Sequence, residues 1–269
     1  MFDELADGVY RRRFESLDLN VGVVVGEMGV LIIDTRASHR EADQLIDELK
    51  SLTSLPVAWV INTHWHWDHT FGNSRFDDAD LWGHRLCRQA LSERPVEMIR
   101  GALDWLREDG ANVLADEIEE VVIVPPELVF DDTATIDLGG RIVELSYYGL
   151  AHTDADIVIR VPQSGVAFFG DMLEQGAPPN FGDSYPLAWP ETLAVAMAPP
   201  QDSIVPGHGD VLTEAEALAQ LEELKEVARL ARSCLIEGVP VEEAARQGPY
   251  PSEVMVGALR RAIEVADSG

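Results

Sequence analysis

The stretch Thr63-His64-Trp65-His66-Trp67-Asp68-His69-Thr70 holds three of the chain's seven histidines within six positions. It follows 57–62, an apolar run with the composition of a buried β-strand. Side chains two positions apart on an extended chain point to the same side, so His64 and His66 can share one metal ion. Packing at a strand end does not explain so many histidines, and we therefore predict a metal site here.

Asp68 and His69 lie beyond the strand end, where they can turn toward a second metal ion. Imidazole and carboxylate ligands without thiolates suit zinc, although iron or manganese occupies nitrogen and oxygen sites of the same kind. The only cysteines are Cys87 and Cys234, and we expect both to be reduced thiols outside the metal site. The predicted cofactors are two zinc ions, with iron or manganese as alternatives.

Three later segments each place one potential metal ligand at the end of a predicted strand. These segments are Gly149-Leu-Ala-His152-Thr-Asp, Phe168-Phe-Gly170-Asp171 and Pro206-Gly207-His208-Gly209. They add His152, Asp171 and His208 to the candidate ligands. This recurrence strengthens the prediction of a metal site.

The remaining pattern predicts an α/β (α+β) chain that forms a single domain over residues 1–269. Strands grouped in each half, with helices between and after them, indicate two sheets packed face to face with helices outside. A helical insertion is expected at about 85–120 and C-terminal helices at about 213–266, where Thr213 and Glu216 have the spacing of a capping box. Other strands are expected at 21–26, 30–34, 141–148, 157–161, 166–169 and 203–205, and other helices at 39–52 and 187–198.

The order and spacing of the candidate ligands resemble the metallo-β-lactamase-fold hydrolase superfamily, over nearly the whole chain. The resemblance implies a four-layer αβ/βα sandwich of two mixed β-sheets with helices outside and the metals at the rim where the sheets meet. It also implies seven ligands. One metal would be bound by His64, His66 and His152, the other by Asp68, His69 and His208, and Asp171 would bridge them.

The composition argues against some partners and compartments. The chain carries 48 acidic and 20 basic residues, and its formal net charge of −28 repels nucleic acids and anionic membrane surfaces. No apolar run approaches the ~18 residues needed to cross a bilayer, and the acidic start 1–8 does not look like a targeting segment. We expect a cytoplasmic protein that acts on a small molecule, without nucleic-acid or membrane partners. The oligomeric state stays open.

Two metal ions held close together predict hydrolysis by a metal-bound hydroxide. No serine or cysteine nucleophile is needed, and Asp68 is the candidate catalytic residue because it would orient the hydroxide as well as bind metal. The resemblance implies a small ester, lactone, thioester or amide as substrate. Two alternatives stay open: amide hydrolysis of the metallo-β-lactamase type, and the oxidoreductase chemistry of a mononuclear-iron persulfide dioxygenase, whose site is similar.

The residue at position 171 and a lack of cations narrow the substrate. Metallo-β-lactamases proper usually carry Cys or Ser where Asp171 stands, whereas the seven-ligand set with Asp is similar to that of glyoxalase II-type thioesterases and quorum-signal lactonases. Residues 161–224 contain no Lys or Arg and so offer no cationic anchor for a carboxylate or phosphate. We expect a neutral or apolar substrate, unless an arginine of the insertion folds over the metals. These arginines are Arg85, Arg88, Arg94, Arg100 and Arg107.

Aromatic and amide side chains near the ligands are candidates for a substrate pocket. The segment 174–190 directly follows Asp171 and is rich in Pro, Gly and aromatic residues. Either Asn180 or Tyr185 is a candidate hydrogen-bond donor to an oxyanion. The full set of pocket candidates is Trp65, Trp67, Asn180, Phe181, Tyr185 and Trp189. The alternative is that the aromatic rings pack in the core or against a sheet edge.

Asp34 and His84 are candidates to form a hydrogen bond with a metal-binding histidine without binding the metal themselves. Asp34 ends a predicted strand and resembles the superfamily's buried acidic residue near the histidine motif. His84 follows a predicted strand. A simple turn residue at Asp34 and a histidine without contact to the site at His84 are the alternatives.

Overall fold

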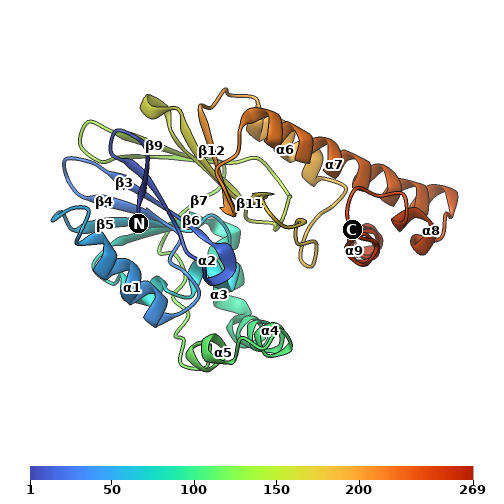
Figure 1. Ribbon diagram of the computed structural model, residues 1–269, viewed down its shortest axis with the longest axis horizontal. Coiled ribbons are helices and arrows are strands. Elements are labelled where there is room, and N and C mark those ends of the chain that lie inside the picture. The colour runs from blue at the N-terminus through green and yellow to red at the C-terminus, as the bar shows by residue number, and fades with distance from the viewer. Residues whose placement is uncertain (269) are drawn as a thin grey trace.

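The computed structural model describes residues 1–268 and arranges its strands in two β-sheets (Figure 1). The first sheet contains β1 (Asp3–Ala6), β2 (Val9–Arg13), β3 (Asn20–Val25), β4 (Val30–Ile33), β5 (Val57–Ile61), β6 (Asp80–His84) and β7 (Leu128–Phe130). They lie in sequence order, antiparallel from β1 to β4 and parallel from β4 to β7. This sheet is therefore mixed.

The second sheet is also mixed and has the order β12-β11-β10-β9-β8. Its strands are β8 (Thr133–Asp137), β9 (Ile142–Tyr147), β10 (Ile157–Val161), β11 (Val166–Glu174) and β12 (Ser203–His208). The pairs from β8 to β11 are antiparallel, and β12 pairs with β11 in parallel. Pro206 is tolerated within β12 because this strand lies at the edge of the sheet.

The helices occupy the connections between strands and the C-terminal region. They are α1 (His39–Leu49), α2 (Trp67–Thr70), α3 (Arg85–Glu93), α4 (Pro95–Glu108), α5 (Asn112–Ile118), α6 (Trp189–Met197), α7 (Glu214–Arg232), α8 (Val241–Ala245) and α9 (Ser252–Ser268). Shorter turns include the 3-10 turn η1 (Ser16–Asp18) and the π-helical turn η4 (Ser233–Glu237). Thr213 and Glu216 form the predicted capping box of α7.

Four layers follow from the alternation of side chains along the strands. In β4, Leu31 and Ile33 face the second sheet and pack with residues such as Ile159, whereas Ile32 faces α1 and packs on Leu45. The outer face of the second sheet packs on α6 and α7, with Trp189 among the buried residues, and the same core continues along α7 to α8 and α9. Figure 1 shows α7 projecting from the sheets, with α8 and α9 at its far end. The expected four-layer arrangement of two mixed sheets with helices outside is confirmed.

Several element bounds differ from the sequence expectation. Strands β1 and β2 were not predicted because they carry charged residues and few apolar ones. Strand β11 continues past Phe169 to Glu174, because its pairing with β12 resumes after an irregularity at Gly170. The helical insertion forms as α3, α4 and α5, between β6 and β7. That the chain is one domain stays a prediction.

No helix within residues 1–268 is both long enough and apolar enough to cross a membrane.

Candidate metal centre

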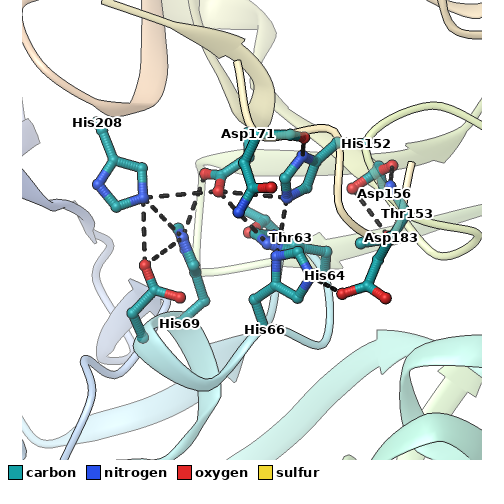
Figure 2. Close-up of polar contacts among 12 residues, drawn as sticks. Thr63, His64, His66, His69, His152, Thr153, Asp156, Asp171, Asp183 and His208 are labelled. Carbon is teal, nitrogen blue, oxygen red and sulfur yellow. Dashed lines mark hydrogen bonds and ion pairs between the residues drawn. The ribbon is translucent and has the colours of Figure 1, made fainter. Parts of the chain in front are cut away.

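Seven side chains meet where the ends of strands from the two sheets come together (Figure 2). Four come from the histidine motif, which runs from the end of β5 into α2, and the others come from the loop after β9, from β11 and from the end of β12. The structure thus brings together every candidate metal ligand that the sequence predicted. They are His64, His66, Asp68, His69, His152, Asp171 and His208.

The first group of ligand atoms contains three imidazoles and one carboxylate. His66 Nδ1 lies 2.8 Å from His152 Nε2. Asp171 Oδ2 lies 3.6 Å from His64 Nε2 and 3.5 Å from His152 Nε2. Ligand atoms of the four residues lie within 4.8 Å of one another, so one ion can contact all of them.

The second group consists of Asp68, His69 and His208. The Nε2 atoms of His69 and His208 are 3.4 Å apart. Asp68 Oδ2 lies 3.5 Å from His69 Nε2 and 3.2 Å from His208 Nε2. These three atoms form a nearly equilateral triangle.

Asp171 lies between the two groups, as Figure 2 shows. Besides the first group, its carboxylate faces His69 Nε2 at 3.2 Å and His208 Nε2 at 3.5 Å. Two glycines make this position possible. At Gly207 a Cβ would overlap the Asp171 carboxylate, and at Gly170 the positive φ of 52° brings the backbone against Thr63.

The dimensions of the second group fit zinc. In a tetrahedral site with Zn–N distances of ~2.0–2.1 Å, ligand atoms are about 3.3–3.4 Å apart. The separations in the second group are 3.2 to 3.5 Å. His64 Nε2 and Asp171 Oδ1 are also buried without a hydrogen-bond partner, although buried polar atoms are normally paired. A metal ion at each group would supply the missing partner.

In the first group, each histidine is held from outside by a hydrogen bond to its other nitrogen. His152 Nδ1 donates to the Asn180 carbonyl at 3.1 Å, and His66 Nε2 lies 3.3 Å from Asp183 Oδ2. His64 Nδ1 is 3.0 Å from Thr63 Oγ1. These partners accept a hydrogen bond from the outward nitrogen, so the proton stays on that nitrogen. The inward nitrogen therefore keeps its lone pair for a metal.

In the second group the outer partners come from the N-terminal half of the chain. Asp34 Oδ2 lies 2.8 Å from His69 Nδ1, and the Leu17 carbonyl lies 2.7 Å from His208 Nδ1. Both Asp34 (φ 66°) and Leu17 (φ 61°) adopt left-handed backbone conformations that side chains other than glycine rarely take. Strained backbone of this kind concentrates at functional sites.

Asp34 joins the two groups as well as holding His69. Its Oδ1 accepts from the Thr63 backbone N–H and its Oδ2 accepts from Thr63 Oγ1, both at 2.8 Å. Since the Thr63 hydroxyl donates a hydrogen bond to Asp34, its oxygen accepts a hydrogen bond from His64 Nδ1. The structure therefore places Asp34 where the sequence prediction put it, against a histidine of the motif.

The electrostatic states of the two groups differ. In the first, burial lowers the pKa of His64 well below its usual range, and burial lowers the pKa of His152 to about 3. In the second, burial would also lower the histidine pKa, but the combined effect of the neighbouring carboxylates, Asp171 first, outweighs it and raises the pKa of both His69 and His208 well above normal. Burial would raise the pKa of Asp171, yet the surrounding histidines, His69 first, hold it well below normal.

Glu174 is a neighbour of the site that the sequence prediction missed as a side chain of interest. Its carboxylate lies within 4.8 Å of ligand atoms of Asp171 and His208. Burial, followed by the charge of Asp171, raises the pKa of Glu174 to about 8. The only signal in the sequence is its place three residues after Asp171, and strand alternation alone would put the two on opposite faces. The irregular pairing of β11 with β12 brings them together.

Three of the predicted pocket residues are core residues instead. Trp189 is fully buried and its indole N–H donates to the Met172 carbonyl, and Phe181 is buried against Trp189 and Tyr250. Trp65 is also buried, with its N–H donated to Asp154. Apolar surface already covered by protein cannot line a substrate pocket, so the expectation for these three residues is corrected.

The other pocket candidates, Trp67, Tyr185 and Asn180, are more exposed than these three residues. Trp67 lies beside Trp105, with the two rings tilted by 49°, and Tyr185 is half-buried in the segment after β11. Asn180 is exposed, but its side-chain oxygen accepts from the Gly182 N–H within its own turn. His84 shares a hydrogen bond with the Asp131 carbonyl and its ring stacks on Tyr147 at 4.0 Å, so its expected contact with a metal-binding histidine is not formed.

One arginine of the insertion approaches the metal centre. The guanidinium of Arg94 lies 4.6 Å from the centre of the Trp65 ring, between two candidate ligands in the sequence. Arg85 pairs with Asp131 and Arg107 with Glu119, and Arg88 donates to the Glu127 carbonyl. Of the insertion arginines with described contacts, Arg94 is therefore the one that remains a candidate for a cation near the site.

Comparison with known proteins gives the same family at three levels. The model of the metallo-beta-lactamase superfamily matches residues 17–230. A metallo-beta-lactamase type 2 of Bacteroides fragilis is 26% identical over 193 residues, which are 70% of this chain and 68% of the relative.

Solved structures show the likeness of fold. A metallo-beta-lactamase from Pontibacter korlensis superposes with a TM-score of 0.65 at 18% identity, covering 84% of this chain and 98% of the other. One from Erythrobacter litoralis gives 0.61 at 20% identity, covering 84% and 96%. Because the family model matches most of the length of this chain, the chain belongs to the metallo-β-lactamase superfamily of metal-dependent hydrolases.

Proposed function

We propose that this chain is a dinuclear zinc hydrolase that cleaves a small ester, lactone, thioester or amide. The observation that carries the proposal is the position of Asp171, whose carboxylate lies 3.2 to 3.6 Å from nitrogens of both ligand groups. One carboxylate can bridge two ions only in such an arrangement. Neutral imidazole and carboxylate ligands are those that zinc prefers when thiolates are absent.

Zinc ions at such sites lower the pKa of water and polarise a carbonyl or leaving-group oxygen. The residues of the protein hold the metal-binding side chains in place and orient the water that attacks the substrate. Asp68 is the only carboxylate in the second group, and its Oδ2 faces His69 and His208. We assign it the catalytic role of orienting the attacking water by accepting a hydrogen bond at Oδ2.

Charges around the site support a neutral or apolar substrate. Asp183 adds a carboxylate beside the first ligand group, and residues 161–224 supply no Lys or Arg. A substrate carboxylate would meet like charge there. Arg94 is the one arginine of the insertion with a described contact to the histidine motif.

A second candidate is hydrolysis of the amide in a β-lactam ring. The observation that favours it is the naming of the relatives from Bacteroides fragilis and from Bacillus sp. (strain 170) as metallo-beta-lactamase type 2. The Asp at position 171 and the absence of Lys and Arg from residues 161–224 favour the esterase-like substrates instead. A mononuclear-iron persulfide dioxygenase is the remaining alternative from the sequence.

One panel of assays separates these functions. Zinc-loaded protein would be tested on neutral esters, lactones, thioesters and β-lactams, and protein purified without chelator would be analysed for metal. We expect ester or lactone turnover that chelation abolishes, and no turnover by Asp68→Ala. The matched control is Asp137→Ala, an exposed carboxylate on β8. An untouched panel would sink the hydrolase proposal, and one iron per chain with oxygen uptake on glutathione persulfide would favour the dioxygenase.

A further inference from the structure

The last two helices lie beyond the part of the chain that the family model matches. That match ends at residue 230, whereas α8 and α9 span Val241–Ala245 and Ser252–Ser268. Helix α9 packs on α7 and α8 and contributes Met255 and Leu259 to the buried core. These helices therefore need an explanation from this chain's own contacts.

One side chain of α9 reaches toward the metal centre. Arg261 Nε donates to the Ser184 carbonyl at 2.9 Å, and Arg261 Nη2 donates to the Asp183 carbonyl at 3.3 Å. Its guanidinium also lies 5.9 Å from the centre of the Tyr185 ring. Both carbonyls belong to the β11–α6 loop, which we define as residues 175–188 between those two elements.

The same loop holds two candidate metal ligands. The Asn180 carbonyl accepts from His152 Nδ1, and the Asp183 carboxylate contacts His66 Nε2, as Figure 2 shows for Asp183. Arg261 thus binds the backbone of the residue whose side chain holds His66. We propose that Arg261 is a positioning residue that fixes the β11–α6 loop, and through it His66 and His152, for binding of the first metal ion.

The physical basis is preorganisation of the part of the loop around Asp183, which is exposed although Phe181 and Ser184 beside it are buried. The Asp183 side chain is 53% exposed, so little packing restrains it, whereas Arg261 is 22% exposed and anchored on a helix. A fork of two donors on adjacent carbonyls restricts the loop backbone, and a ligand holds its geometry only as well as its outer partners do. The core contacts of Phe181 with Trp189 and Tyr250 do not involve Arg261. Removing the arginine should therefore loosen the loop without unfolding it.

The effect should be confined to one half of the metal centre. His69 and His208 are held by Asp34 and Leu17, which have no described contact with the β11–α6 loop. The loop does meet His208 through Gln175, whose N–H donates to the His208 backbone carbonyl at 3.2 Å, but Gln175 is the first residue of the loop and lies eight positions before Asp183. The inference rests on the proposed ligand set but not on turnover. Metal binding can be measured whether or not any substrate is cleaved, so failure of the hydrolase proposal and failure of this one are distinguishable.

The test compares Arg261→Ala with Arg260→Ala in the full-length chain. Arg260 is the matched control because it is adjacent on α9, 66% exposed, and paired with Glu242. Metal-free protein would be titrated with zinc against a chromogenic chelator, and with Co²⁺ to record the absorption of each ion. We expect Arg261→Ala to weaken the binding of one ion about tenfold and to alter its Co²⁺ spectrum, with the other ion changed less than about twofold.

Two further variants keep the outcome decisive. Arg261→Lys retains a cation but lacks the fork, so we expect partial recovery, and it carries the test if circular dichroism shows Arg261→Ala unfolded. In an Asp183→Ala background, the effect of Arg261→Ala should shrink because both act through the same contact. Equal binding of both ions by folded Arg261→Ala and by Arg260→Ala, equal weakening of both ions, or full additivity with Asp183→Ala would each overturn the proposal.

Discussion

The two halves of the metal centre hold similar ligands in different electrostatic states. The first half has three buried histidines, and the pKa is lowered for His64 and His152 by burial. The second has two histidines beside Asp68 and Asp171, and there the carboxylate charge overcomes burial and raises the histidine pKa. The first half is thus ready for metal as neutral imidazoles, whereas the second holds protons until metal replaces them.

The halves also differ in what holds them. Outer partners of the first half include Asn180 and Asp183 of the β11–α6 loop, which connects to the C-terminal helices. Outer partners of the second half are Asp34 and Leu17, which lie in the N-terminal region. Changes in each region should therefore affect one ion more than the other.

Asp171→Asn should have the largest effect because it removes the charge shared by both halves. The amide keeps the shape but neutralises the bridge, so we expect the affinity for either ion to fall more than about 100-fold, beyond the range of changes in outer partners. Zinc competition assays would measure both affinities. Asp137→Asn, an exposed carboxylate far along β8, is the control. If Asp171→Asn weakened only one ion, Asp171 would not be a bridge.

Exchanging the outer carboxylates one at a time should separate the halves. We expect Asp34→Asn to weaken the second ion by about 10–100-fold because it removes the charge that accepts from His69, and to weaken the first ion less, through Thr63 and His64. Asp183→Asn should weaken the first ion, and by less than this, since Asp183 is more exposed. Titration with Co²⁺ reports each ion through its absorption. The comparison fails if both variants weaken the same ion most.

Proton release should distinguish the two binding steps. At neutral pH the raised pKa of His69 and His208 means that metal must displace protons there, whereas His64 and His152, with lowered pKa, are already neutral. We expect lower pH to weaken the second ion more steeply than the first. Calorimetry in buffers of different ionisation enthalpy counts the protons, and equal release in both steps would contradict the distinction.

Asp156 gives a test, with a smaller expected effect, of how strongly burial beside the first half opposes ionisation of a carboxyl group. Burial, only partly offset by hydrogen bonds from Thr153, raises the pKa of Asp156 to about 7. An acid whose folded pKa is raised contributes stability that is present below its unfolded pKa near 3.8 and is lost as pH rises toward 7. In metal-free protein, Asp156→Asn should flatten the decline in unfolding free energy between about pH 4 and pH 7. Urea unfolding at several pH values measures this, and an unchanged slope would show that Asp156 is not the source.

Much of the ligand set was predictable because its residues are rare and regularly placed. Histidines at spacing two after an apolar strand, and single ligands at later strand ends, identified the residues that the structure brings together. The nearly continuous apolar runs of β4 and β10 likewise predicted a strand in each sheet. Charged edge strands such as β1 carried no such signal.

The surroundings of the site were less predictable because they depend on long-range contacts. Nothing local distinguishes Asp183 from the neighbouring polar residues, yet it contacts a histidine 117 positions away. Phe181 and Trp189 were expected in a pocket because aromatic residues near a site can serve either pocket or core. Only the packing of the C-terminal helices, with α9 over the β11–α6 loop, decides for the core.

The most direct test of the account is the number of zinc ions that the native chain binds at saturation, measured by native mass spectrometry of metal-free protein titrated with zinc. Two ions per chain are predicted, with Asp68→Ala retaining the first more tightly than the second. A single ion per chain at saturating zinc would contradict the division of the site into two halves bridged by Asp171.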